Sequence, residues 1–369
     1  MIGGLQVPAV SYAATNEKVD DIKPDTKLLK SFQKELKKHI DNREENITIA
    51  YKTKAKNGRE VMDTLYKEYT KIVDADEYLK YNVASTKYSI HGIPGNYTFT
   101  LKITYRESKE QTQHVKAQAK SIISSILKVG MDEHEKVKAI HDYVVKHVSY
   151  DTSYKAYTAY EALVNRSAVC QGYTLLTYQL LKEAGIQSHI VTGMGDGQAH
   201  AWNLVNIDGK WYHLDTTFDD PVPDKEGRVT YSYFNMSDEQ FSKDHSWDRS
   251  KYPAATTNYY NELTSKIKVG SPKTLVYQQM LKDTNLVYLS AKYGADNYNE
   301  LKKKLQKQFA GQPKKVEVRY KQSMDGTMQD VKKVLNEISW PNGVKRVSYQ
   351  VAPYSAQADY SLATITFKY

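Results

Sequence analysis

Apolar residues recur at helical spacing in two lysine-rich stretches near the two ends of the chain. The first carries Leu28, Leu29, Phe32 and Leu36, and the second carries Leu301, Leu305 and Phe309. Apolar positions three or four apart form one face of an amphipathic helix. Each stretch is followed by a short segment, 47–52 or 316–321, in which every second residue is apolar. This alternation predicts a half-buried strand after each helix.

Both ends of the chain continue in the same order. A second amphipathic helix is predicted around Met62, Leu65 and Tyr69 in one, and around Val331, Val334 and Ile338 in the other. Each end then closes with a pair of strands, of which the last is 97–105 or 360–369. We therefore predict two similar α-β-α-β-β modules that arose by internal duplication. Chance likeness between segments rich in Lys and Tyr is the alternative.

The centre of the chain changes from helical to strand periodicity. Helices are predicted over 113–127, from Met131 or Asp132 onward, and over 168–183, with Gly185 ending the last one. Strands are predicted at 188–192, 200–207 and 210–214. Asp208-Gly209 joins the last two and is typical of a tight hairpin. The predicted fold class is α+β: a papain-like core of helices packed on an antiparallel sheet, flanked by the two modules.

The domain boundaries follow from this order. We predict an N-terminal module over 15–108, a catalytic core over 109–260 and a C-terminal module over 261–369. Residues 1–14 resemble the remnant of a signal peptide, because Ser11-Tyr12-Ala13 fits the small-x-small cleavage pattern. They lack the basic start and the full apolar run of such a peptide, so a truncated signal and a chance likeness both stay open. We expect a secreted or cell-surface protein of a Gram-positive-type bacterium.

Composition narrows the range of partners. The chain has 369 residues, of which 40% are hydrophobic and 26% charged, as in ordinary soluble proteins. The net charge of +9 indicates either a solvated lysine-rich surface or attraction to an anionic cell-wall polymer. The sequence has no arginine-rich stripe or RNA-binding motif and no apolar run of about 18 residues, so we expect no nucleic-acid partner and no membrane span. A single Cys excludes an internal disulfide and a CxxC metal site, and we expect no cofactor and no metal.

The single cysteine, Cys170, lies at the start of a predicted helix, where backbone N–H groups and the helix dipole favour a thiolate. His200 and Asp215 follow on two strands that the predicted hairpin places side by side. A thiol, an imidazole and a carboxylate in this arrangement suit a nucleophile, its base and an orienting acid. Taken singly, a buried structural Cys, a packed His and a capping Asp are the ordinary alternatives.

Other residues near these three are weaker candidates. Tyr157 and Tyr160 are candidates for a second oxyanion donor or for core packing, and Gln171 is a candidate for substrate or oxyanion binding. Trp202 is expected to shield the site from water. His213 is a weaker candidate for the base, because it would point beside Asp215. Ser237 and Gln240 predict a capping box, whereas 244–247 is predicted to be a loop, either along the cleft or at the surface.

Three motifs in this order resemble the transglutaminase-like core: Val169-Cys170-Gln171-Gly172-Tyr173, His200-Ala201-Trp202-Asn203 and Leu214-Asp215-Thr216-Thr217. The likeness covers about residues 113–250. It implies that Cys170 is the nucleophile, His200 the base and Asp215 the orienting acid. The family includes transferases that join Gln side chains to amines, deamidases, proteases and peptide amidases. We therefore expect thiol-dependent acyl transfer on protein or peptide amides; a non-catalytic cell-surface binding protein with this fold is the alternative.

Overall fold

The computed structural model describes residues 26–369 except 221, 224–226, 341, 355 and 358. The predicted signal-peptide remnant, 1–14, lies outside the described residues. The chain divides into two compact units: one runs to Val229 and includes Asn235–Thr256, and the other consists of Thr230–Phe234 and Thr257–Tyr369. The three domain boundaries inferred from the sequence stay a prediction.

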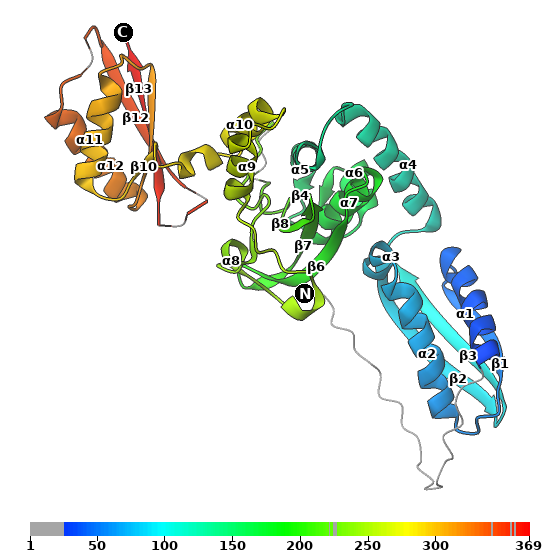
Figure 1. Cartoon of the computed structure of the whole chain (residues 1–369). Coiled ribbons are helices and arrows are strands. Elements are labelled where there is room, and N and C mark those ends of the chain that lie inside the picture. Colours follow the sequence, from blue (N-terminus) through cyan, green and yellow to red (C-terminus); the bar gives the residue numbers. More distant parts are fainter. Residues whose placement is uncertain (1–25, 221, 224–226, 341, 355, 358) are drawn as a thin grey trace. The chain divides into compact units, whose positions relative to one another are not determined.

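The first unit begins with a small helix-and-strand module, blue to cyan in Figure 1. Its antiparallel sheet has the strand order β1-β3-β2, and α1 and α2 pack side by side on it. The buried core joins Phe32 and Leu36 of α1 to Phe99 and Leu101 of β3. The predicted helices and strands are confirmed, whereas α3 was not expected. The elements are α1 (Thr26–Asp41), β1 (Asn46–Lys52), α2 (Gly58–Asp74), α3 (Glu77–Asn82), β2 (Val83–Ile93) and β3 (Asn96–Tyr105).

Helices follow in the same unit. Capping boxes at Ser108, Asp132 and Thr158 begin α4, α5 and α6 by satisfying N–H groups of the first turn. The helix predicted from residue 168 begins at Cys170, because Ser167 and Ala168 form the short strand β5. These elements are α4 (Lys109–Ile126), α5 (Glu133–His147), β4 (Ser149–Tyr150), α6 (Ala159–Val164), β5 (Ser167–Ala168) and α7 (Cys170–Glu183).

An antiparallel sheet completes the first unit and lies against α7. Its strand order is β8-β7-β6-β9, and the Thr174 hydroxyl of α7 donates to the carbonyl of Ala201 on β7. Asp208 and Gly209 both have positive φ, 51° and 77°, which is the backbone of a type I′ hairpin. Helices on an antiparallel sheet confirm the predicted fold class of the core. The elements are β6 (Ser188–Gly195), β7 (Gln198–Ile207), β8 (Lys210–Leu214), α8 (Asp238–Phe241), β9 (His245–Trp247) and the 3-10 turn η1 (Arg249–Lys251).

The prediction of a loop at 244–247 is wrong for most of that segment. His245–Trp247 is strand β9, which pairs with Gly193–Gly195 at the edge of the sheet. His245 is 3% exposed and therefore belongs to the interior. The preceding helix α8 has the predicted capping box between Ser237 and Gln240. The sequence signal failed here because three residues are too few to show the alternation of a strand.

The second unit contains the C-terminal module, orange to red in Figure 1. Its sheet has the order β10-β11-β13-β12, and α11 and α12 pack on it around Leu301, Leu305, Val331 and Ile365. The predicted helices and strands are confirmed, and α9 and α10 were not expected. The elements are α9 (Tyr259–Lys268), α10 (Thr274–Asp283), η2 (Leu286–Leu289), β10 (Gly294–Ala295), α11 (Tyr298–Phe309), β11 (Lys315–Tyr320), α12 (Met324–Glu337), β12 (Arg346–Pro353) and β13 (Ser361–Lys368).

The two modules share their topology. In each module the last strand lies in the middle and pairs with the two earlier ones. The orders are β1-β3-β2 in the N-terminal module and β11-β13-β12 in the C-terminal module. Helix α3 is particular to the N-terminal module, and β10 to the C-terminal one. Whether this topology arose by duplication stays a prediction. Among the described residues, no helix has the length and apolar character that crossing a membrane requires.

Candidate active site

Cys170 is the first residue of α7 and lies at the end of that helix nearest β4 and β5. Strand β5 pairs in parallel with β4, and the N–H of Val169 donates to the carbonyl of Ala156, so both flanks of the turn before Cys170 are fixed. The thiol is free and largely buried, at 8% exposure. The backbone N–H groups of a first helical turn have no carbonyl partner within the helix, which favours an anion at this position.

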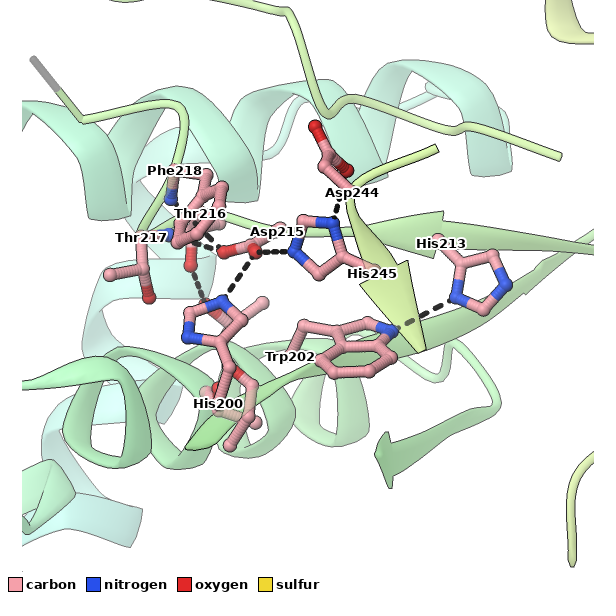
Figure 2. A network of polar contacts seen from close by, with 12 residues as sticks. His200, Trp202, His213, Asp215, Thr216, Thr217, Phe218, Asp244 and His245 are labelled. Carbon is pink, nitrogen blue, oxygen red and sulfur yellow. Dashed lines mark hydrogen bonds and ion pairs between the residues drawn. The ribbon is translucent and has the colours of Figure 1, made fainter. Parts of the chain in front are cut away.

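His200 and Asp215 meet as the hairpin predicts. The Nε2 atom of His200, on β7, lies 2.6 Å from Oδ2 of Asp215, which directly follows β8 (Figure 2). Cys170 also influences this ring, because the thiol is one of the groups that raise the pKa of His200. The structure therefore pairs His200 with Asp215 and sets Cys170 near the ring; that the three residues act as a triad stays a prediction.

The Asp215 carboxylate is completely buried but well supplied with donors. The backbone N–H groups of Thr217 and Phe218 donate to its Oδ1 at 2.9 and 3.1 Å. Burial alone would raise the pKa of Asp215, but His200, His245 and the Phe218 N–H outweigh that cost and hold the pKa well below its usual range. Asp215 is thus a carboxylate, not a carboxylic acid, at neutral pH.

The pKa of His200 is shifted upward, whereas that of Asp215 is shifted downward. Burial lowers the pKa of His200, yet the Asp215 charge and the contact with Cys170 are stronger and raise it to about 10. A histidine with this pKa is an imidazolium at neutral pH. An imidazolium beside a thiol at a helix N-terminus is the electrostatic setting in which a thiolate is stable.

A second histidine, His245, also lies next to the Asp215 carboxylate. His245 Nε2 is 3.4 Å from Asp215 Oδ2, and His245 Nδ1 is 2.6 Å from Asp244 Oδ1. Figure 2 shows His200 and His245 pointing at Asp215 from two strands. Gly195 leaves room for both rings, because a Cβ atom there would lie 2.9 Å from the His200 ring and 3.0 Å from the His245 ring. The sequence interpretation did not assign His245 to this contact.

Trp202 lies beside the triad as part of the sheet's buried face. Its ring stacks near His200, with 5.9 Å between ring centres, and its Nε1–H donates to Nδ1 of His213 at 2.9 Å. His213 in turn contacts Asp238 through Nε2 at 2.8 Å. Burial lowers the pKa of His213, so it stays neutral. With both ring nitrogens engaged, His213 supports Trp202 and is not placed to act as the base.

Tyr157 and Tyr160, the two candidates for an oxyanion donor or for core packing, both lie against neighbouring side chains. Tyr160 packs its ring edge-on against His114, with 5.6 Å between centres, and the Tyr157 ring lies under the guanidinium of Arg106 at 4.8 Å. Tyr150 of β4 was missed: its partner across the strand pair is Ala168, two residues before the cysteine. Burial, followed by the nearby Cys170, raises the pKa of Tyr150 to about 12, so its hydroxyl remains a donor.

Gln171 and Gly172 fix the start of α7 instead of facing outward. The Gln171 amide donates to the backbone carbonyl of Tyr81 at 2.7 Å. A Cβ atom on Gly172 would lie 2.5 Å from the Ala168 Cβ and 2.9 Å from the Thr158 carbonyl oxygen. The close approach that Gly172 permits is therefore to the protein's own backbone, and Gln171 ties the catalytic turn to the end of α3.

Three side chains could in principle hold a metal ion. The ligand atoms of His200, Asp215 and His245 all lie within 4.8 Å of one another, and these residue types bind zinc. The direct 2.6 Å contact between His200 and Asp215 leaves no room for an ion between those two atoms. We assign no metal to this cluster.

A comparison with known protein families matches the central part of the chain. Residues 120–216, which include Cys170, His200 and Asp215, match the family model of the transglutaminase-like superfamily. The transglutaminase-like core inferred from the sequence is thereby confirmed. That it is of a bacterial secreted type stays a prediction.

Two curated relatives and one solved structure are similar over part of the chain. Kyphoscoliosis peptidase of Mus musculus is 24% identical over 180 residues, which are 41% of this chain and 27% of that protein. Its Homo sapiens counterpart is 24% identical over 173 residues, 39% of this chain and 26% of that protein. The chain thus spans about a quarter of the length of these relatives. The crystal structure of a TGase is 17% identical and covers 57% of this chain and 62% of its own, with a TM-score of 0.30.

Proposed function

We propose that this protein is a thiol-dependent acyl-transfer enzyme that acts on amide bonds of proteins or peptides. The observation that carries the proposal is the His200 ring, which pairs with Asp215 at 2.6 Å and whose pKa is raised by Asp215 and Cys170. A sheet-forming histidine needs neither partner for packing. A nucleophilic thiol, its base and an orienting carboxylate need all of these contacts.

The reaction follows from the charges of the resting site. The Cys170 thiolate attacks the carbonyl carbon of the amide and forms a carbon–sulfur bond. As the carbon–nitrogen bond breaks, His200 gives its proton to the leaving ammonia or amine and becomes neutral. Water or a second amine then attacks the thioester, His200 takes its proton, and the thiolate leaves. Water gives deamidation or peptide hydrolysis, whereas an amine gives cross-linking.

The oxyanion formed during these steps needs hydrogen-bond donors. We assign this role to the backbone N–H of Cys170, at the start of α7, and to the hydroxyl of Tyr150. Removing one oxyanion donor lowers kcat by about 100-fold or more. Tyr150→Phe is expected to lower kcat with little change in KM. An unchanged kcat in steady-state assays would remove Tyr150 from the mechanism.

His245 is assigned as a positioning residue that acts through Asp215. Both of its ring nitrogens face a carboxylate oxygen, that of Asp215 at 3.4 Å and that of Asp244 at 2.6 Å. His245→Leu removes the polar ring beside Asp215 and should lower kcat roughly tenfold while shifting the pH profile of kcat/KM. His245→Gln keeps an N–H donor and should restore most of the activity. If both variants match the wild type in rate and pH profile, His245 has only a packing role.

Substrate and location are part of the proposal. The relatives named as peptidases favour a protein or peptide substrate over a small amide. A place outside the cell, at the bacterial surface, is supported by the sequence of residues 1–14 and by the net charge of +9.

The experiment that tests the function is intact-mass analysis of a Gln-containing peptide incubated with a primary amine and the purified protein. Wild type should convert the peptide, and Cys170→Ala should not. A peptide–amine adduct would define a transglutaminase, conversion of Gln to Glu a deamidase, and a cut peptide a protease. Equal results for wild type and Cys170→Ala over a peptide library would contradict the proposal and favour a binding protein.

A further inference from the structure

The C-terminal module contains a basic hollow that the proposed acyl transfer does not use. It has a volume of about 460 Å³, which is in the range of small-ligand sites. Its cations come from two elements: Lys303, Lys304 and Lys307 from α11, and Arg319 from β11. We call these four residues and the space between them the cationic hollow.

Arg319 is buried in an unusual way for an arginine. It is only 9% exposed, and its guanidinium lies 4.9 Å from the centre of the Tyr360 ring. Gly294, its partner in the β10–β11 pair, leaves space for it, because a Cβ atom there would lie 2.5 Å from the guanidinium. The fold therefore builds a place for this side chain through a glycine on one side and an aromatic ring on the other.

The Arg319 guanidinium makes no ion pair in the described part of the chain. Among the residues that the structure describes, no carboxylate lies within ion-pair distance of its guanidinium, and its buried Nε has no hydrogen-bond partner. Burying a cation without a partner is costly, and an unpaired donor adds to the cost. A bound anion would remove both costs.

The two carboxylates at the rim are engaged with other groups. Asp296 accepts from the Tyr360 hydroxyl at 2.8 Å, and Glu300 accepts from the Asp296 N–H and the Asn297 amide at 2.9 Å each. Lys304 donates to the backbone carbonyls of Ala291 and Lys292. Four cations therefore face two carboxylates, and the hollow keeps a net positive charge.

We propose that the cationic hollow binds a phosphate-type oxyanion, with Arg319 as the buried contact and Lys303 and Lys307 as the outer ones. The planar guanidinium matches the oxygens of a phosphate with paired N–H donors, and the excess positive charge suits a group that carries more than one negative charge. The volume admits more than a single phosphate, so a free phosphate and a phosphate within a longer chain are both accommodated.

The test is calorimetric titration of the full chain with inorganic phosphate and with tripolyphosphate at constant ionic strength. Wild type should bind at least one of the two; binding of phosphate alone identifies a free ion as the source, and binding of tripolyphosphate alone identifies a chain. The double variant Lys303→Gln/Lys307→Gln, at two exposed positions, should weaken binding roughly tenfold or more. Gly294→Ala should do the same by displacing the Arg319 guanidinium.

The matched control is Lys332→Gln, which removes an exposed lysine of α12 outside the hollow. It should leave the affinity unchanged. Binding that weakens equally in Lys332→Gln and in the double variant would reduce the effect to general surface charge and overturn the proposal. So would the absence of binding to both phosphate probes. Neither result bears on Cys170, because the assay contains no amide substrate.

Discussion

The N-terminal and C-terminal modules have the same strand order but different chemistry at equivalent places. Strand β1 of the first carries Ala50, exposed, where the likeness in sequence places Arg319 on β11 of the second. Arg319 is buried, because β10 covers that edge of the C-terminal sheet, and it lines the cationic hollow. Of these two equivalent positions, only the one in the C-terminal module carries a buried charge.

The N-terminal module instead directs its polar groups toward the catalytic core. Glu77 of α3 accepts from the Ile190 N–H on β6 and contacts His189 at 2.6 Å. The carbonyl of Tyr81 holds Gln171, next to the cysteine. The comparison teaches that the N-terminal module holds the start of α7 through Tyr81 and Gln171, whereas the C-terminal module carries a cationic hollow of its own.

The largest expected effect comes from removing the N-terminal module, and removal of the C-terminal module is its comparison. Deleting 257–369 should leave a folded protein whose Cys170 reactivity is unchanged, because these residues belong to a separate compact unit. Deleting 26–105 should give an unfolded or aggregated chain, since it exposes the surface of α7 that α3 contacts and takes the Tyr78 hydroxyl away from the buried Glu107. Circular dichroism and thiol titration measure both results. Equal loss of folding and of Cys170 reactivity in the two deletions would contradict the difference between the modules.

Substitution of a single glutamate should show the same difference between the two modules, with a smaller loss of stability than a deletion. Glu107 is buried and accepts from the hydroxyls of Tyr78 and Thr112 and from the Tyr160 N–H. Glu107→Ala leaves these donors unpaired and should lower the free energy of unfolding by about 3 kcal/mol. Burial raises the pKa of Glu107, so the neutral Glu107→Gln, which keeps an acceptor oxygen, should cost less.

The matched control lies in the C-terminal module. Glu337 also accepts from a tyrosine hydroxyl, that of Tyr298, at 2.9 Å, but it is exposed. Glu337→Ala should change the free energy of unfolding much less than Glu107→Ala does, because water screens an exposed contact. Urea denaturation of the variants measures the difference. A loss for Glu337→Ala as large as that for Glu107→Ala would mean that burial does not distinguish the two contacts.

The smallest predicted effect concerns the amide next to the cysteine. Gln171→Leu keeps the volume of the side chain but loses the bond to the Tyr81 carbonyl. The first turn of α7 should then hold Cys170 less accurately, with roughly a tenfold loss of kcat/KM and little change in the melting temperature. Gln171→Glu, which cannot donate, should behave like the leucine variant. Full activity in both would show that the N-terminal module does not position the nucleophile.

Much of the fold could be predicted from the sequence, because periodicity and caps are local. Asp132, Asp208-Gly209 and Gly185 mark the beginning of α5, the hairpin turn and the end of α7 as expected. The hairpin also predicted the meeting of His200 with Asp215. Residues far apart in the chain could not be predicted in this way: no local pattern shows that Tyr81 meets Gln171, that His245 meets Asp215, or that Gly294 makes room for Arg319.

The central claim is that Cys170 is a thiolate nucleophile paired with His200. Because Cys170 is the only cysteine, the rate of alkylation by iodoacetamide reports on it alone, by intact mass. At pH 6, native wild type should react more than about tenfold faster than His200→Gln and than its own urea-unfolded form, since an ordinary thiol is hardly ionised there. Equal rates for wild type and His200→Gln, or modification of Cys170 only after unfolding, would contradict the account.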